Sequence, residues 1–172
     1  MQEAEAKCCD EAGEYLRAIH GYDACWAQRR LSKEGMLDAL VLAWQMTDPG
    51  LSAHARLTDA EVEFASQRFL SWGRAWRPLF AEFEELEFWL RYVQFLEPEA
   101  GFGAAITIAW CEQALLANPG CVAPLLYLNA FADPLQKPLG RARLREWLGG
   151  RRTTRAQYVL AICAANENSE PR

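Results

Sequence analysis

The sequence predicts an all-α protein, and three observations support that fold class. Apolar residues recur at the three- and four-residue spacing of amphipathic helices through most of the chain. No segment shows the strict alternation of a half-buried strand. The chain has 172 residues, 51% of them hydrophobic and 12% aromatic, so it is long and apolar enough to fold alone. We therefore expect one domain of six to eight helices over residues 1–165, followed by a polar, disordered tail at 166–172.

The first part of the chain is predicted to hold three helices. Residues 5–20 are rich in helix formers, and we expect that helix to end at Gly21 with His20 in its last turn. A second helix is expected over residues 32–46 with Ser32 as its cap. The third, at 58–76, opens with Thr58 and Glu61, the spacing of a capping box. We place His54 in the loop that precedes it.

Residues 78–96 are predicted to be the central helix of the fold. Pro78 cannot continue the preceding helix without losing a hydrogen bond, so we expect a kink or a new start there. Apolar residues then cover both sides of the segment. A helix with that pattern is normally surrounded by other helices.

Four shorter helices are expected in the remaining sequence. The segment at 104–117 is stopped by Asn118, Pro119 and Gly120, and Pro124 suits the first turn of the next helix. We place residues 133–140 in a loop. The last two helices are expected at 141–148, stopped by two glycines, and at 153–165.

Residues 111–128 pose the question of a helical repeat. Ala114 to Pro119 resembles the end of a tetratricopeptide repeat, which would imply a protein-binding solenoid. Such repeats recur every 34 residues, and the loop prolines Pro49 and Pro98 do not lie at that interval from Pro119. We therefore favour an ordinary helical hairpin, with degenerate hairpin repeats as the alternative.

The sequence contains no motif that names a reaction, a cofactor or a metal. It lacks the phosphate-binding, dinucleotide-binding and nucleophile-elbow patterns. Its six cysteines, which we expect to be reduced, and two histidines do not show the spacing of a zinc site. We expect no catalytic residue, cofactor or metal. An enzyme whose site assembles from dispersed residues, with Cys and Glu side chains as candidates, remains an alternative. Substitution of Cys25, Cys111 and His54, one at a time, would test it.

Charge is distributed unevenly along the chain. Residues 1–100 carry 10 basic and 18 acidic side chains (−8), whereas residues 101–172 carry 8 and 5 (+3). The free amides at the start of the last helix, beside Thr153 and Thr154, would favour an anion. Arginine also binds carboxylates and phosphates with a two-pronged geometry. We predict a partner-binding basic patch in the segment 137–155, made of Arg141, Arg143, Arg145, Arg151, Arg152 and Arg155.

These features favour a small cytoplasmic module that binds another protein, such as an immunity or inhibitor protein or a secretion chaperone. Neither a targeting signal nor a membrane span is evident, and arginine outnumbers lysine fifteen to three, which suggests a GC-rich bacterial genome. A nucleic-acid-associated regulator that uses the basic patch is the main alternative, although the acidic pI of about 5.2 argues against it. An acidic face could instead bind a basic partner, through Glu61, Glu63, Glu82, Glu84, Glu85 and Glu87.

Overall fold

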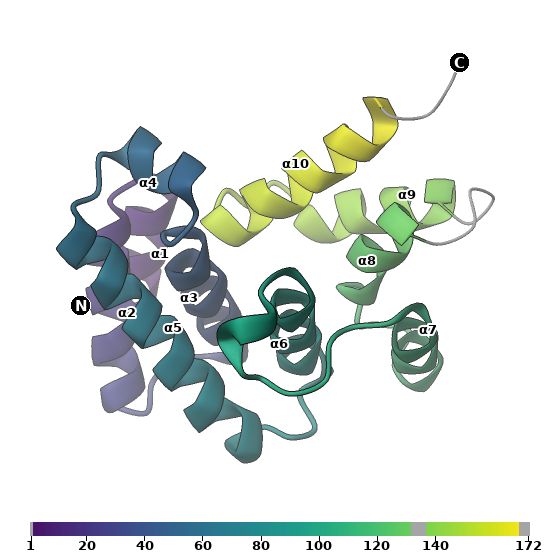
Figure 1. The fold of residues 1–172 in the computed structure, drawn as a ribbon, viewed down its shortest axis with the longest axis horizontal. Helices are drawn as coiled ribbons and strands as arrows, with labels where there is room; N and C mark the ends of the chain where they lie inside the picture. Colours follow the sequence, from purple (N-terminus) through teal and green to yellow (C-terminus); the bar gives the residue numbers. More distant parts are fainter. Residues whose placement is uncertain (1, 132–136, 169–172) are drawn as a thin grey trace. The chain divides into compact units, whose positions relative to one another are not determined.

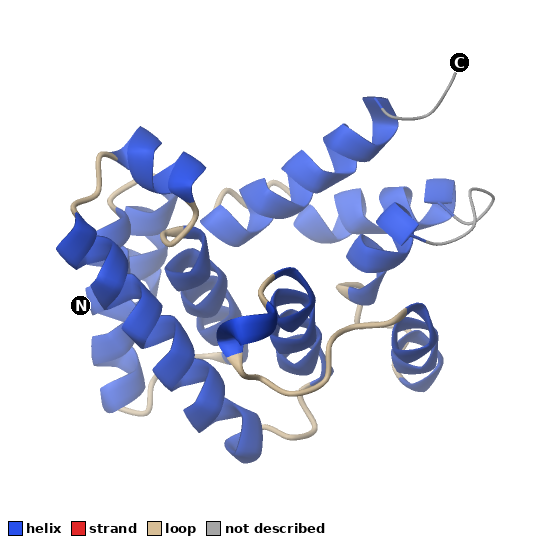
Figure 2. Cartoon of the chain, viewed as in Figure 1, coloured by secondary structure: helices blue, strands red, loops and turns tan. Residues whose placement is uncertain are grey.

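Helices account for most of the chain, as the sequence predicts. The computed structural model describes residues 2–131 and 137–168, and the side chains of 2–131 and 140–165. Within these residues there is no strand, and the all-α prediction is confirmed (Figure 2). Ten α-helices and one 3₁₀ helix occur there, more than the six to eight expected (Figure 1): α1 Glu3–Glu11, α2 Tyr15–Ala27, α3 Lys33–Gln45, α4 Pro49–Ala55, α5 Asp59–Leu79, α6 Glu84–Leu96, η1 Pro98–Ala100, α7 Ile108–Ala117, α8 Pro124–Phe131, α9 Lys137–Leu148 and α10 Thr154–Asn168.

The chain divides into two compact units that interleave in sequence. Unit 1 contains residues 1–76 and 152–155, and unit 2 contains residues 77–151 and 156–172. Unit 1 carries 10 basic and 12 acidic side chains (−2), and unit 2 carries 8 and 11 (−3). The charge reversal along the sequence therefore does not produce two units of opposite charge. The expectation of one domain over residues 1–165 stays a prediction.

Unit 1 is built on helices α1, α2 and α3, which pack against one another. Helix α3 is buried along its length from Gly35 to Trp44, because nearly all its residues are apolar. Helix α5 adds an aromatic cluster in which Trp76 stacks on Trp72 with ring centroids 5.2 Å apart. Trp76 also forms an edge-to-face contact with Trp26 of α2, with ring centroids 5.4 Å apart. Burial of such large rings supplies much of the driving force for folding.

Unit 2 is organised around α6, whose residues Phe88, Trp89 and Tyr92 are buried. Tyr158 of α10 lies against Trp89, with centroids 6.2 Å apart, and its hydroxyl is 3.0 Å from that of Tyr92. Helix α8 packs against α7, α9 and α6. The prediction of a helix that is buried on several sides is thus confirmed for α6 within unit 2.

Several predicted helix starts and stops are confirmed by hydrogen bonds or backbone angles. The Ser32 hydroxyl accepts from the Gly35 amide at 3.0 Å and caps α3. Glu61 and Thr58 form the expected capping box, with the Thr58 amide donating to Glu61 at 2.7 Å. Pro124 begins α8, and Gly149 and Gly150 end α9 with positive φ angles of 47° and 82°.

Two predictions in the first part of the chain are wrong. The helix expected at 5–20 is two helices, broken at Gly13, which has a φ of +79° that a helix cannot contain. Helix α2 then continues through Gly21, so His20 lies in its middle. His54 is not in a loop either. It lies in the last turn of α4, which begins at Pro49 behind the Asp48 cap.

Several later boundaries also differ from those expected. Helix α5 continues through Pro78 and ends one residue later at Leu79, and the central helix begins at Glu84 instead of Pro78. Helix α7 begins at Ile108, and α9 begins four residues before the expected start. Helix α10 includes residues 166–168 of the expected tail, whereas 169–172 lie outside the described residues.

Candidate functional site

Four arginines of the predicted basic patch lie together in unit 2, on α9 and the turn after it. Leu144 and Leu148 are 1% and 3% exposed, so they fix one face of α9 in the core. Arg143 and Arg145 are exposed, while Arg141 and Arg151 are half-buried. Because residues four apart share a helix face, Arg141 and Arg145 follow one edge of the buried stripe, and Arg143 follows the other edge with Trp147.

Each edge of α9 reaches a neighbouring element of unit 2. On one edge, the Arg143 guanidinium donates a hydrogen bond to the carbonyl of Pro119, in the turn between α7 and α8. On the other edge, Arg141 and Arg145 lie near Cys163 of α10. Burial raises the pKa of the Cys163 thiol, and the two arginines act in the opposite direction. The basic surface therefore extends from the α7–α8 turn across α9 to α10.

The end of α9 joins an arginine to an aromatic ring. The Arg151 guanidinium lies over the ring of Trp147, 4.8 Å from its centroid, which is a cation–π contact. The two glycines that end α9 let the chain turn back sharply enough to place Arg151 there. We call Arg141, Arg143, Arg145, Trp147 and Arg151 the α9 surface.

The remaining two arginines of the predicted patch belong to unit 1. Arg152 is exposed, but Arg155 is 1% exposed and cannot contact a partner. Its Nε donates to Asp38 at 2.8 Å, and its Nη2 donates to Glu34 at 2.5 Å. The prediction that Arg155 forms part of a binding patch is therefore wrong. This side chain is a structural ion-pair partner for α3.

The predicted anion position at the start of α10 is occupied by the chain's own Asp10. The Thr154 amide donates to the two carboxyl oxygens of Asp10 at 3.1 and 3.2 Å. The Thr154 hydroxyl donates to the same carboxyl at 2.5 Å, and the Thr153 hydroxyl donates to Asp38 at 3.2 Å. The sequence identified a helix start with free donor groups, but not the carboxyl that accepts from them.

The acidic face proposed as an alternative is divided between the units and partly engaged within them. In unit 1, Thr58 lowers the pKa of Glu61 through its backbone amide first and then its hydroxyl, and Glu63 accepts from Gln67 at 2.8 Å. In unit 2, the carboxylate of Glu87 accepts hydrogen bonds from the guanidinium of Arg77 at 2.9 and 2.7 Å and from that of Arg91 at 2.6 Å. The other residues of this set, all in unit 2, range from half-buried to exposed: Glu82, Glu84 and Glu85.

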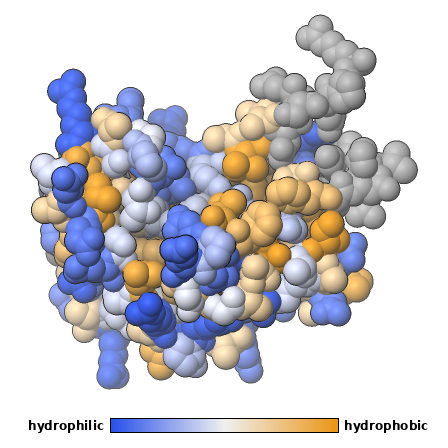
Figure 3. Space-filling view, viewed as in Figure 1, coloured by the Kyte–Doolittle hydropathy of each residue, from blue (hydrophilic) through white to orange (hydrophobic). Residues whose placement is uncertain are grey.

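Unit 2 also exposes aromatic side chains, which sequence reasoning did not single out. Phe131 of α8 and Phe95 of α6 are 52% and 38% exposed, and they lie 5.7 Å apart in an edge-to-face contact. The buried ring of Tyr127 supports both, at 4.6 and 5.4 Å. Apolar side chains are visible at the surface over α8 and its neighbours (Figure 3). Exposed aromatic rings are characteristic of protein interfaces.

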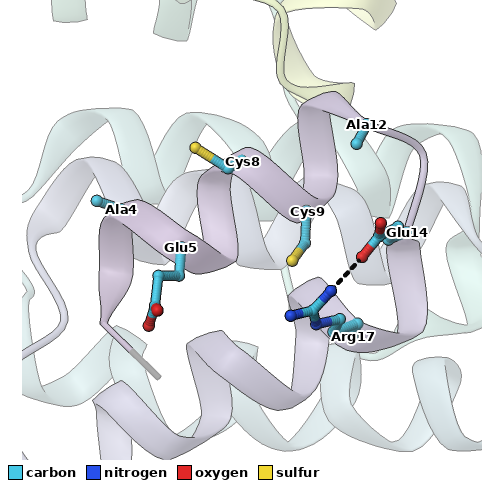
Figure 4. A pocket seen from close by; sticks show the side chains of 7 residues that line it. All are labelled: Ala4, Glu5, Cys8, Cys9, Ala12, Glu14 and Arg17. Atoms are coloured by element: carbon cyan, nitrogen blue, oxygen red, sulfur yellow. Dashed lines mark hydrogen bonds and ion pairs between the residues drawn. The ribbon is translucent and has the colours of Figure 1, made fainter.

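A shallow hollow of about 390 Å³ lies between α1 and the start of α2 in unit 1 (Figure 4). The thiol of Cys9 points toward Arg17, which is paired with Glu14 at 2.8 Å, whereas the thiol of Cys8 points away. Burial raises the pKa of the Cys9 thiol, and Glu14 raises it further against the influence of Arg17. A thiol that keeps its proton is a weak nucleophile, so Cys9 is not activated in this hollow.

The other candidates for chemistry are explained by packing. Burial raises the pKa of Cys111 and that of Cys121 to about 12, as expected for thiols that act as small hydrophobic side chains. His20 is exposed and lies against Phe64, with ring centroids 4.9 Å apart. In the part of the chain that the structure describes, no three His, Cys, Asp or Glu side chains are grouped so that they could hold a metal ion.

Among the described helices, none combines the length and the apolar character that crossing a bilayer requires. No family model, curated protein or solved structure matches the chain.

Proposed function

We propose that the chain binds another protein and that the α9 surface of unit 2 is the contact region for an acidic patch on that partner. The arrangement on α9 carries the proposal: arginines follow both edges of a helix whose leucines are fixed in the core. A helix held in this way presents its guanidinium groups from a rigid support. Less conformational entropy of the backbone is then lost when a partner binds.

The residue types of the α9 surface fit this role. Arginine and tryptophan are enriched among the residues that dominate the energy of protein interfaces. Arginine pairs with carboxylates through two parallel hydrogen bonds, and charge complementarity raises association rates and specificity. An immunity or inhibitor protein and a secretion chaperone are two concrete forms of such a module.

The two alternatives are less well supported. Two residues of the acidic face have structural roles within the protein: Glu87 accepts hydrogen bonds from two arginines, and Glu61 caps a helix. A nucleic-acid regulator would use the same arginines, but unit 2 carries a net charge of −3, with 8 basic and 11 acidic side chains. Binders of nucleic acid usually carry a basic excess over the domain.

The proposal is tested by charge reversal on α9 with a matched control. Proteins captured from nuclease-treated extract of the source organism are identified, purified and titrated against wild type and two double variants. The test variant carries Arg143→Glu and Arg145→Glu. The control carries Arg30→Glu and Arg74→Glu, the same charge change at exposed positions of unit 1.

We expect the α9 variant to weaken binding of an acidic partner at least tenfold, whereas the control binds within about threefold of wild type. Added salt should weaken wild-type binding, because exposed charges are screened. Equal affinity of the α9 variant and wild type would contradict the assignment of the surface. Capture that disappears after nuclease treatment would support the nucleic-acid alternative instead.

A further inference from the structure

The segment 152–155 is held in unit 1 by a cluster of buried polar groups. Asp10 of α1, Asp38 of α3 and Thr153 are 1%, 5% and 1% exposed. Thr154 donates to Asp10, and Arg155 donates to Asp38, as described above. The first turn of α10 is thereby joined to two helices that precede it by more than 110 residues in sequence.

The charges of this cluster are unequally compensated. Arg155 gives its Nε to Asp38 and its Nη2 to Glu34, whose side chain is 51% exposed. Asp10 instead receives the amide and the hydroxyl of Thr154, which are neutral donors. A buried carboxylate without a cation as donor is costly, so such a group tends to keep its proton.

Burial is the largest influence on the pKa of Asp10, and it outweighs the hydrogen bonds from Thr154. Burial raises the pKa of Asp10 to about 7, the hydrogen bonds from Thr154 oppose this, and the charges of Asp38 and Glu11 raise it further. On α2, Tyr15 and Tyr22 lie close enough to this carboxyl for its charge to raise their pKa values.

The two tyrosines do not change charge near neutral pH. Burial, followed by the charge of Asp10, raises the pKa of Tyr15. The pKa of Tyr22 is raised by burial, then by Asp38, Asp10 and Glu3, with Arg155 opposing. Both hydroxyls therefore stay protonated, and the charge change near pH 7 is assigned to Asp10.

We propose that Asp10 is a pH-responsive latch for the first turn of α10: its neutral carboxyl keeps residues 152–155 attached to α1, and its ionisation favours their release. In the released state the carboxyl is hydrated and titrates near its ordinary pKa of 3.8. The raised pKa in the attached state means that attachment is strongest below pH 4. It weakens as the pH rises towards 7 and is constant above that value. In this window each pH unit changes the ratio of released to attached forms about tenfold.

Hydrogen–deuterium exchange of the full chain tests this proposal, because the Thr154 amide is one of the groups that the latch holds. Exchange of this amide is measured from pH 5 to pH 8 and corrected for the intrinsic pH dependence of exchange. We expect its opening equilibrium to rise about tenfold per pH unit between pH 5 and 7 and to level off above pH 7. In Asp10→Asn, which keeps an oxygen acceptor but cannot ionise, the rise should disappear. In Glu11→Gln, an exposed neighbour on α1, it should remain.

Two results would overturn the latch. One is a corrected opening equilibrium that does not change between pH 5 and 7 in wild type. The other is the same rise in Asp10→Asn as in wild type. If Asp10→Asn does not fold, the titration of the Asp10 carboxyl in the wild type is followed by carbon NMR. A titration midpoint near pH 4 instead of pH 7 would contradict the proposal.

Discussion

Arg155 offers the sharpest test of how unit 1 is held together. Replacement of this arginine by alanine removes the guanidinium that donates to Asp38 at 2.8 Å and leaves that carboxylate 5% exposed, with the Thr153 hydroxyl at 3.2 Å. A buried ion that loses its charged partner typically costs about 3–5 kcal/mol. The contact with Glu34 adds little to this figure, because the Glu34 side chain is 51% exposed and its charge is screened by solvent.

The measurement is urea denaturation at pH 7, followed by far-ultraviolet circular dichroism. We expect Arg155→Ala to lower the free energy of unfolding by about 3–5 kcal/mol. Arg152→Ala, at the exposed position three residues earlier, should change it by less than about 0.5 kcal/mol. The double variant Asp38→Leu, Arg155→Met removes both charges and should cost less than Arg155→Ala alone. A loss of less than about 1 kcal/mol for Arg155→Ala would refute the structural role of the pair.

Two further predictions concern local features. Thr58→Ala removes the capping box of α5 and should lower the free energy of unfolding by about 1 kcal/mol. The control Glu63→Gln, one turn later, should change it by less than about 0.5 kcal/mol. Equal effects of the two variants in urea denaturation would contradict the capping role. Cys8 is exposed and the other five cysteines are buried, so a thiol reagent should modify one cysteine quickly in the native protein and six after denaturation. Fast modification of two or more thiols in the native protein would show that Cys9 or another of the five cysteines is accessible to solvent, which would contradict its burial.

Sequence reasoning worked where the signal is local. Helical periodicity predicted the fold class, and Ser32, Thr58 with Glu61, and the pair Gly149 and Gly150 marked helix ends that the structure contains. The break at Gly13 was missed because helix-forming residues lie on both sides, and one glycine did not outweigh them. Helix α4 was missed because it has only seven residues.

The same distinction between local and long-range signals applies to the functional residues. Arg143 and Arg145 could be predicted as surface groups because charged residues lie beside the apolar positions of a short amphipathic helix. The burial of Arg155 could not, since its partner Asp38 is 117 residues away and only the fold brings the two together. In the sequence, Asp10 is one of several acidic residues of an acidic helix, and nothing local distinguishes it from them. Its contact with Thr154 spans 144 residues.

The most direct test of the central claim is a hydrogen-exchange footprint of the complex with the purified partner. We expect binding to slow exchange in the segment 137–151 and in the α7–α8 turn at Pro119, where the Arg143 edge of the α9 surface lies. Exchange at the start of α5, around Glu61 and Glu63, should not change. Protection confined to α5 or to the acidic start of α6, with none on α9, would show that the partner binds elsewhere and would contradict the proposed function.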